Sequence, residues 1–197
     1  MRRLPSVALL LLFCALPARV YADWLLTPFL GTAFGNDTTF LVFETNTGRK
    51  LTLGASVALI GSGILGVEAD VGHTPGFFQG SDPRGLVLTS RVTTFGGNFI
   101  IAAPLALTRE SLRPYVVGGL GLIQARSQHA ADIFPIDQNL LGLTLGAGAL
   151  GLVTDRAGLR FDIRHIKAVS GSEGPFERPG TSRLRFWRAT AGVTIRY

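Results

Sequence analysis

The sequence has 197 residues, of which 47% are hydrophobic and 16% charged, and its formal net charge is +6 at pH 7. Its mean hydropathy is +0.34, yet beyond residue 22 no stretch offers the roughly 20 consecutive apolar residues that a membrane-spanning helix needs. Lysines and arginines do not cluster with aromatic residues, which excludes nucleic acid as an expected partner. A chain this apolar must place its apolar surface differently, and the wall of a β-barrel can provide for it.

The first 22 residues have the pattern of a cleaved secretory signal peptide. Arg2-Arg3 precede an apolar stretch, Val7–Leu16, and Val20-Tyr21-Ala22 puts small residues at the −3 and −1 positions of a cleavage site. The apolar stretch is too short to cross about 30 Å of hydrocarbon as a helix. We therefore expect a single-domain mature protein, residues 23–197, which lacks Cys14 and hence any disulfide or thiolate chemistry.

Alternation of apolar and polar residues with period two, the signature of a β-strand, recurs along the rest of the chain. It is clearest in Leu159-Arg160-Phe161-Asp162-Ile163-Arg164, where odd positions are apolar and even positions charged. In the fourth segment, Phe95-Gly96-Gly97-Asn98-Phe99 could carry a bulge that flips the faces. Eight strands are expected in all: Trp24–Phe34, Lys50–Leu59, Ile64–Thr74, Leu86–Ile101, Arg113–Ala125, Asn139–Val153, Leu159–Lys167 and Arg183–Tyr197.

The expected connections alternate in length. Those after the second, fourth and sixth strands are short, near Gly61–Gly63, Thr108–Ser111 and Asp155–Gly158. The others are longer and polar: Gly35–Gly48, Pro75–Gly85, Arg126–Gln138 and Ala168–Ser182. This asymmetry is typical of an all-β, antiparallel, up-and-down transmembrane barrel with short periplasmic turns and long external loops. Both termini would then be periplasmic.

Period two alone leaves open whether the apolar face looks at lipid or at a sealed interior, as in soluble eight-stranded barrels. The second face is mostly Gly, Ala, Ser and Thr, as a narrow lumen requires, and the chain ends on an aromatic residue, which together favour a membrane barrel. An unpaired charge in such a lumen costs several kcal/mol, so we expect a structural network of paired charges there. Its members would be Glu68, Asp70, Arg160, Asp162, Arg164, Arg188 and Arg196. Trp24, Trp187 and Tyr197 are candidates for interfacial aromatic girdles.

Three segments, Arg113–Gly121, Leu159–Arg164 and Ala191–Tyr197, resemble the small outer-membrane β-barrel superfamily, which includes the OmpA-like transmembrane domain. The resemblance implies the barrel fold and a location in the outer membrane. It also implies that Tyr197 ends a signal read by the outer-membrane insertion machinery, where a terminal Phe is usual. It implies no specific function, because one fold serves many.

The expected function is a non-enzymatic structural or surface-interaction role, in which four external loops contact lipopolysaccharide, host or neighbouring proteins. Arg49, Lys50, Arg178 and Arg183 would lie near the external headgroups. No cofactor and no metal are expected, since His73 and His129 have no further ligands at zinc spacing. Ligand and oligomeric state stay open.

Two alternatives remain, a narrow solute channel and an outer-membrane lipid A deacylase. For the deacylase, His165 is the candidate base, but Lys167 and Ala168 stand where that family has Ser and Asn.

Overall fold

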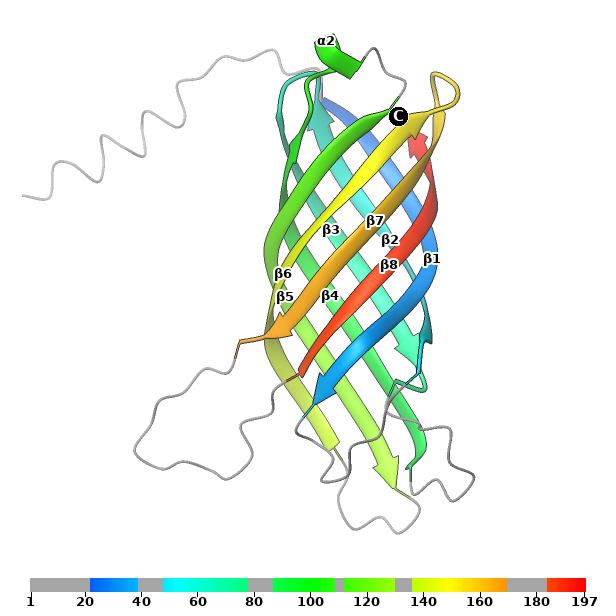
Figure 1. Ribbon diagram of the computed structural model, residues 1–197, viewed down its shortest axis with the longest axis vertical. Helices are drawn as coiled ribbons and strands as arrows, with labels where there is room; N and C mark the ends of the chain where they lie inside the picture. The colour runs from blue at the N-terminus through cyan, green and yellow to red at the C-terminus, as the bar shows by residue number, and fades with distance from the viewer. Residues whose placement is uncertain (1–21, 39–47, 78–86, 109–111, 130–135, 170–183) are drawn as a thin grey trace, which may run out of the picture.

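The computed structural model describes residues 22–38, 48–77, 87–108, 112–129, 136–169 and 184–197. These residues form one closed antiparallel barrel in which each strand pairs with its neighbours in sequence and β8 pairs with β1 (Figure 1). The strands are β1 (Ala22–Thr38), β2 (Lys50–Gly61), β3 (Leu65–Pro75), β4 (Val87–Ala102), β5 (Arg113–His129), β6 (Ile136–Leu152), β7 (Ala157–Ala168) and β8 (Leu184–Arg196). One short helix, α2 (Leu105–Thr108), lies between β4 and β5. Closure leaves no unpaired strand edge among these residues, and the prediction of an eight-stranded barrel is confirmed.

The two ends of the barrel differ. At the turn end, which is uppermost in Figure 1, lie the start of β1, the end of β8, α2 and the connections 62–64, 103–112 and 153–156. The connections 39–49, 76–86, 130–135 and 169–183 leave the opposite end, called the loop end below. No helix among the described residues is long and apolar enough to cross a membrane. The proposed signal peptide falls on residues 1–22, of which only Ala22 is described.

The predicted alternation of short and long connections is wrong at one place. The connection between β4 and β5 spans 103–112 and includes α2, whereas that between β5 and β6 spans only 130–135. The cause is continued pairing between β5 and β6. β5 runs on to His129 and β6 starts at Ile136, and their register reaches Ser127↔Ile136.

The bulge considered for β4 does not occur. Register with β3 runs without a shift from Val71↔Phe95 through Asp70↔Gly96 to Val67↔Phe99. A side chain at Gly96 would collide with the Asp70 carboxylate, so this glycine leaves room in the lumen and does not bend the strand. A register shift does occur in β1 against β8, next to Gly35, whose φ is 63°.

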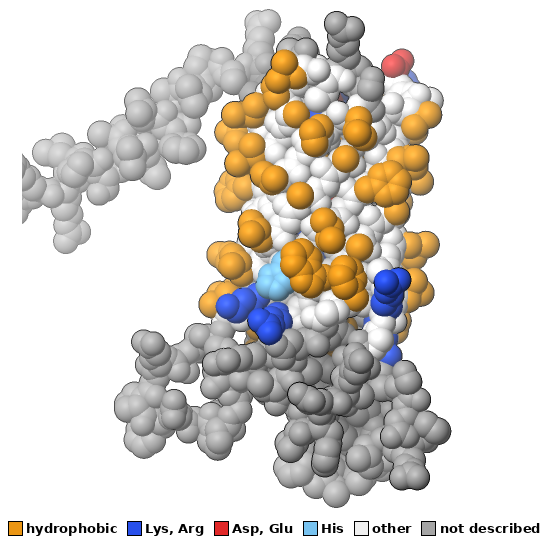
Figure 2. All heavy atoms as spheres, in the orientation of Figure 1, with side chains coloured by type: hydrophobic (Ala, Val, Ile, Leu, Met, Phe, Trp, Pro, Cys, Tyr) orange, Lys and Arg blue, Asp and Glu red, His pale blue; other side chains and the backbone are white. Residues whose placement is uncertain are grey.

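The apolar face of each strand looks outward. On β7, Leu159, Phe161 and Ile163 are 46%, 55% and 43% exposed, whereas Arg160 and Arg164, on the other face, are 5% and 3% exposed. Apolar side chains are accordingly spread over the face of the barrel wall that is seen in Figure 2. A soluble barrel would have the opposite arrangement, with its apolar face sealed inside.

The lumen is filled in three layers. An apolar cluster lies at the turn end, made of Leu25, Ala58, Ile60, Ile100, Ala102, Tyr115, Val117 and Leu150. A second apolar cluster lies at the loop end, made of Ala33, Phe77, Val92, Ile123, Ala125, Ile166, Ala168, Leu184 and Phe186. Phe77 lies just beyond β3 and packs edge-on against Phe186, with ring centroids 5.1 Å apart. Charged side chains occupy the layer between the two clusters.

Candidate functional site

Six charged side chains from three strands meet in the middle layer. β3 contributes Glu68 and Asp70, β7 contributes Arg160, Asp162 and Arg164, and β8 contributes Arg188. All six are buried. Three carboxylates therefore face three guanidinium groups, and the layer is formally neutral.

Glu68 joins two of the arginines. Its Oε2 lies 2.5 Å from Nη2 of Arg160 and its Oε1 lies 2.7 Å from Nη1 of Arg164. The same Oε1 accepts a hydrogen bond of 3.2 Å from the amide of Asn98 on β4. The Glu68 side chain has no exposed surface, so its charge depends entirely on these partners.

Asp70 connects the network to β8. Its Oδ2 lies 2.6 Å from Nη2 of Arg188. Its Oδ1 lies 3.2 Å from Nη1 of Arg164 and accepts a 2.9 Å hydrogen bond from Asn98. Arg188 also donates to the hydroxyl of Thr94, and its guanidinium lies 5.3 Å from the centroid of the Phe29 ring.

Asp162 is the third carboxylate of the layer. Arg164 binds it with two parallel contacts, Nε–Oδ1 at 2.6 Å and Nη2–Oδ2 at 2.7 Å, the bidentate geometry that gives arginine–carboxylate pairs their strength. The hydroxyl of Tyr115 donates to Oδ2 at 2.6 Å and accepts from Nε of Arg160 at 2.6 Å. Tyr115 thus connects the charged layer to the apolar cluster at the turn end.

Glycines on facing strands make room for these large side chains. A Cβ at Gly72 would collide with the guanidinium of Arg188, and a Cβ at Gly148 would collide with the hydroxyl of Tyr115 and with a backbone oxygen of β7. The small residues of the inner face therefore leave the space that the large side chains of the network occupy.

The seventh predicted member, Arg196, lies elsewhere. It is at the turn end, where its Nε is 3.0 Å from Oδ2 of Asp23, and the two side chains are 27% and 37% exposed. Tyr197 is exposed beside it, and its backbone N–H donates to the carbonyl of Trp24. The seven predicted members are three acidic and four basic residues. Without Arg196, the buried layer contains three of each.

Sequence reasoning missed the neutral members of the network, Tyr115 and Asn98. Both have the inward parity of their strands, since Val117 on β5 and Ile100 on β4 are buried two residues further on. Applying that parity to every polar residue, and not only to the charged ones, would have identified them. Arg113, also missed, is buried at the turn end and donates to the carbonyls of Ala103 and Gly63, which ties two connections together.

Little free volume remains around the network. Two chambers of about 10 Å³ each adjoin Arg188, and one of about 20 Å³ lies between the turn-end cluster and Arg196. A cavity of about 10–15 Å³ holds a single water molecule. Within the described residues, no three His, Cys, Asp or Glu side chains are placed so that they could hold a metal ion together.

His165, the candidate base of the deacylase alternative, faces outward near the loop end. Its ring is 4.9 Å from that of Trp187. Its neighbours on the outer face are Ile163 and Lys167 along β7 and Leu145 across on β6, none of which carries a hydroxyl group. Among the described residues, these neighbouring positions on the outer face therefore supply no hydroxyl nucleophile for His165.

No family model matches the sequence, and no curated protein matches it either. Solved structures do match. Neisserial surface protein A superposes with a TM-score of 0.64 at 14% identity, covering 89% of this chain and 97% of that one. OprG from Pseudomonas aeruginosa gives 0.61 at 11% identity, covering 90% and 97%. A major outer membrane protein from Thermus thermophilus gives 0.57 at 14% identity, covering 90% and 100%.

The chain has the fold of the small outer-membrane β-barrels. The resemblance drawn from three strand segments is confirmed at the level of the fold. Sequence identities this low establish the fold only, and one fold serves many functions.

Proposed function

We propose that the protein is a non-enzymatic outer-membrane barrel, a sealed scaffold that presents four connections at its loop end to lipid, host or neighbouring proteins. One observation carries the proposal: the outer wall is apolar, while the lumen is closed by a charge-balanced layer between two apolar clusters. A barrel with these features can span a bilayer, and its outer wall and loop-end connections are then available for interactions.

The height of the apolar wall supports insertion into a membrane. Trp187 lies toward the loop end of β8 and Tyr197 directly after its turn end; both are exposed, and they lie ten positions apart in the sequence. Ten residues at roughly 3.3 Å each, on a strand tilted by about 40°, rise about 25 Å, the height of the apolar band of outer-membrane barrels. The outward residues between them are Ala189, Ala191, Val193 and Ile195. Aromatic residues thus stand at both borders of an apolar band, as interfacial girdles do.

The proposal includes export and orientation. Residues 1–22 would be removed as a signal peptide, leaving residues 23–197 as the barrel. Tyr197 would serve as the terminal residue recognised by the outer-membrane insertion machinery. Both termini would be periplasmic, because in such barrels the short turns face the periplasm and the longer connections face outward.

A sealed lumen argues against the solute-channel alternative. Phe77, Phe186 and Ile123 are completely buried in the loop-end cluster, and the chambers beyond it are the size of single water molecules. A continuous wet path would need the ion pairs to separate as well. One of the structural neighbours was solved with a polyanionic ligand. The Ail protein of Yersinia pestis, which superposes with a TM-score of 0.50, was solved with the heparin analogue sucrose octasulfate.

Membrane fractionation combined with a heated and an unheated gel tests the proposal. We expect the protein in the outer-membrane fraction, with a mobility that shifts only after boiling, because a closed barrel resists detergent at room temperature. In planar bilayers we expect no conductance steps, and we expect no release of acyl chains from lipid A by wild type or by His165→Ala. A soluble periplasmic protein without a mobility shift would refute the location. Steady conductance would favour the channel, and acyl release lost in His165→Ala would favour the deacylase.

A further inference from the structure

A polar recess lies on the outer face of the wall at the loop end, formed by β3, β4 and β5. It has a volume of about 180 Å³ and is lined by His73, Arg91, Thr93, Gln124 and Arg126. All five have the outward parity of their strands, in register with the apolar residues that face away from the lumen. The network in the lumen shares none of these residues.

The residues of this recess form successive rows across the three strands. The last apolar row of the wall is Val71, Phe95 and Leu122, which are paired neighbours and exposed. Two residues further along each strand comes a row of neutral hydrogen-bonding groups: His73, Thr93 and Gln124. The ring of His73 is hydrogen-bonded to the hydroxyl of Thr93 at 2.9 Å.

The next row is cationic. Arg91 on β4 and Arg126 on β5 are direct cross-strand partners. Like charges in this position repel each other and destabilise the pairing unless an anion lies between them. Each row lies about 7 Å from the last along the strand, so apolar, hydrogen-bonding and cationic groups follow one another over about 14 Å.

We propose that this recess binds the phosphate group of a phosphorylated glycolipid in the outer leaflet. The sequence of rows matches such a lipid in order: acyl chains beside Phe95, the sugar and its hydroxyls beside Thr93 and Gln124, and the phosphate between Arg91 and Arg126. Guanidinium groups suit phosphate because they donate parallel, charge-assisted hydrogen bonds. The volume exceeds that of the single-water chambers in the lumen by about an order of magnitude.

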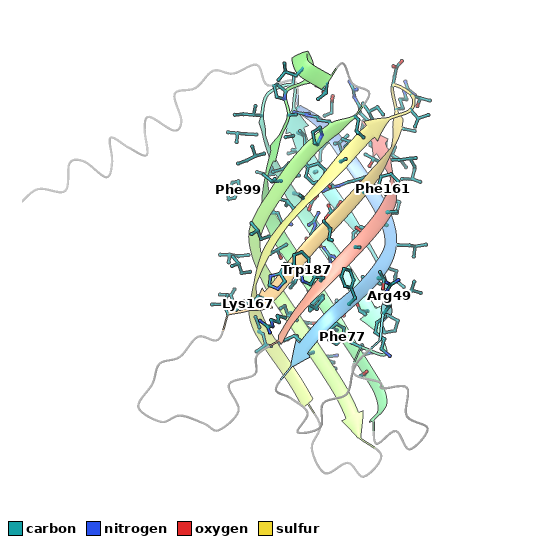
Figure 3. All side chains as sticks on the ribbon, viewed as in Figure 1. Arg49, Phe77, Phe99, Phe161, Lys167 and Trp187 are labelled. Atoms are coloured by element: carbon teal, nitrogen blue, oxygen red, sulfur yellow. The ribbon has the colours of Figure 1, made fainter. Side chains whose placement is uncertain are left out.

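A lipid is favoured over a soluble anion because the recess opens on the membrane-facing wall. Other cations stand at the same border. Lys167 and Arg185 are cross-strand partners on β7 and β8, and Lys167 and Arg49 lie at nearly the same level along the barrel (Figure 3). Basic side chains gather where the apolar wall meets the loop end (Figure 2). The inference rests on the proposed location, since it needs the loop end to face the leaflet that carries such a lipid.

The test compares two double variants that lose the same charge. Arg91→Gln with Arg126→Gln removes the cations of the recess, and Lys167→Gln with Arg185→Gln removes the other outward pair. Each protein is purified from membranes, checked for the mobility shift on boiling, and placed in nanodiscs of zwitterionic phospholipid. A bisphosphorylated diglucosamine glycolipid is then titrated in, and its dephosphorylated counterpart and free inorganic phosphate serve as further arms.

We expect saturable binding of the phosphorylated glycolipid to wild type, weakened at least tenfold in Arg91→Gln with Arg126→Gln and less than threefold in the other double variant. The dephosphorylated glycolipid should bind at least tenfold more weakly than the phosphorylated form. Equal losses in both double variants would overturn the site in favour of diffuse attraction, and full competition by inorganic phosphate at equal concentration would overturn the lipid assignment. Thr93→Val, which keeps every charge, should weaken binding severalfold. If wild type is absent from the membrane fraction, the proposed function fails, an outcome distinct from failure of the recess.

Discussion

Glu68→Gln should destabilise the barrel far more than its small change in shape suggests. The substitution keeps the outline of the side chain and removes one buried charge that lies 2.5 Å and 2.7 Å from two guanidinium groups. With about 4 Å between the centres of the two charged groups and an effective dielectric constant of 20, each such pair is worth about 4 kcal/mol of gross attraction. Desolvation of the carboxylate, several kcal/mol, offsets part of that sum. The free energy of unfolding should therefore fall by about 3–5 kcal/mol, the usual cost of breaking a buried pair from one side.

The measurement is urea unfolding in lipid vesicles, followed by tryptophan fluorescence. The sequence has two tryptophans, Trp24 and Trp187, and both are exposed on the outer wall, so unfolding moves each of them out of lipid. Asp23→Asn is the matched control. It makes the same acid-to-amide change at the partly exposed pair with Arg196, and it should cost less than about 1 kcal/mol.

A second variant separates charge balance from loss of packing. Adding Arg160→Met to Glu68→Gln restores neutrality in the layer and should recover a large part of the lost stability, so that the two substitutions are strongly non-additive. A cost of Glu68→Gln no greater than that of Asp23→Asn would contradict a charge-balanced layer, as would a double variant whose loss of stability equals the sum of the losses in the two single variants.

Two other substitutions probe the filling of the lumen by the same assay. Gly148→Val should lower the free energy of unfolding by at least about 1–3 kcal/mol, because the new side chain would collide with Tyr115. Gly63→Ala, at a turn with open space around it, should leave the free energy of unfolding nearly unchanged. Equal effects of the two substitutions would mean that Gly148 is not needed to make room for Tyr115. Phe77→Ala should cost about 3–5 kcal/mol by leaving a cavity against the loop-end cluster, and Phe99→Ala, on the exposed wall, clearly less; the reverse order would show that Phe77 is not packed inside.

The strands and their faces could be predicted because one physical rule, period-two alternation, governs the entire wall. An apolar outer wall and a narrow lumen constrain both faces of every strand, so segments such as Leu159–Arg164 show their orientation in the sequence. Strand ends were less predictable. β5 and β6 continue past Ala125 and Asn139 because their backbones keep pairing, and backbone pairing leaves no mark in side-chain polarity.

The composition of the charged layer could be predicted only in part. The alternation of side chains along a strand shows which charged residues face inward, but not where they lie along the barrel axis. Arg196 lies at the turn end of that axis, whereas Arg160 and Arg164 lie in the middle. Which charged side chains meet depends on how strands that are not hydrogen-bonded to each other face one another across the lumen. Asp70 on β3 reaches Arg188 on β8, 118 positions away in sequence, across the lumen. Such a pairing follows from the curvature of the closed barrel, which no local pattern encodes.

The charge distribution also bears on where this barrel can recognise anything. The three carboxylates and three guanidinium groups of the middle layer cancel, so the net charge of the barrel is carried by residues outside this layer. Within the described part of the wall, outward cations occur at the loop end as cross-strand pairs: Arg91 with Arg126, and Lys167 with Arg185. A neutral, closed interior contributes little long-range field, whereas basic side chains at the rim attract anions to that end of the barrel. Interaction with anionic lipid or polyanionic partners is therefore expected at the outer rim and the connections above it, and not along the axis of the barrel.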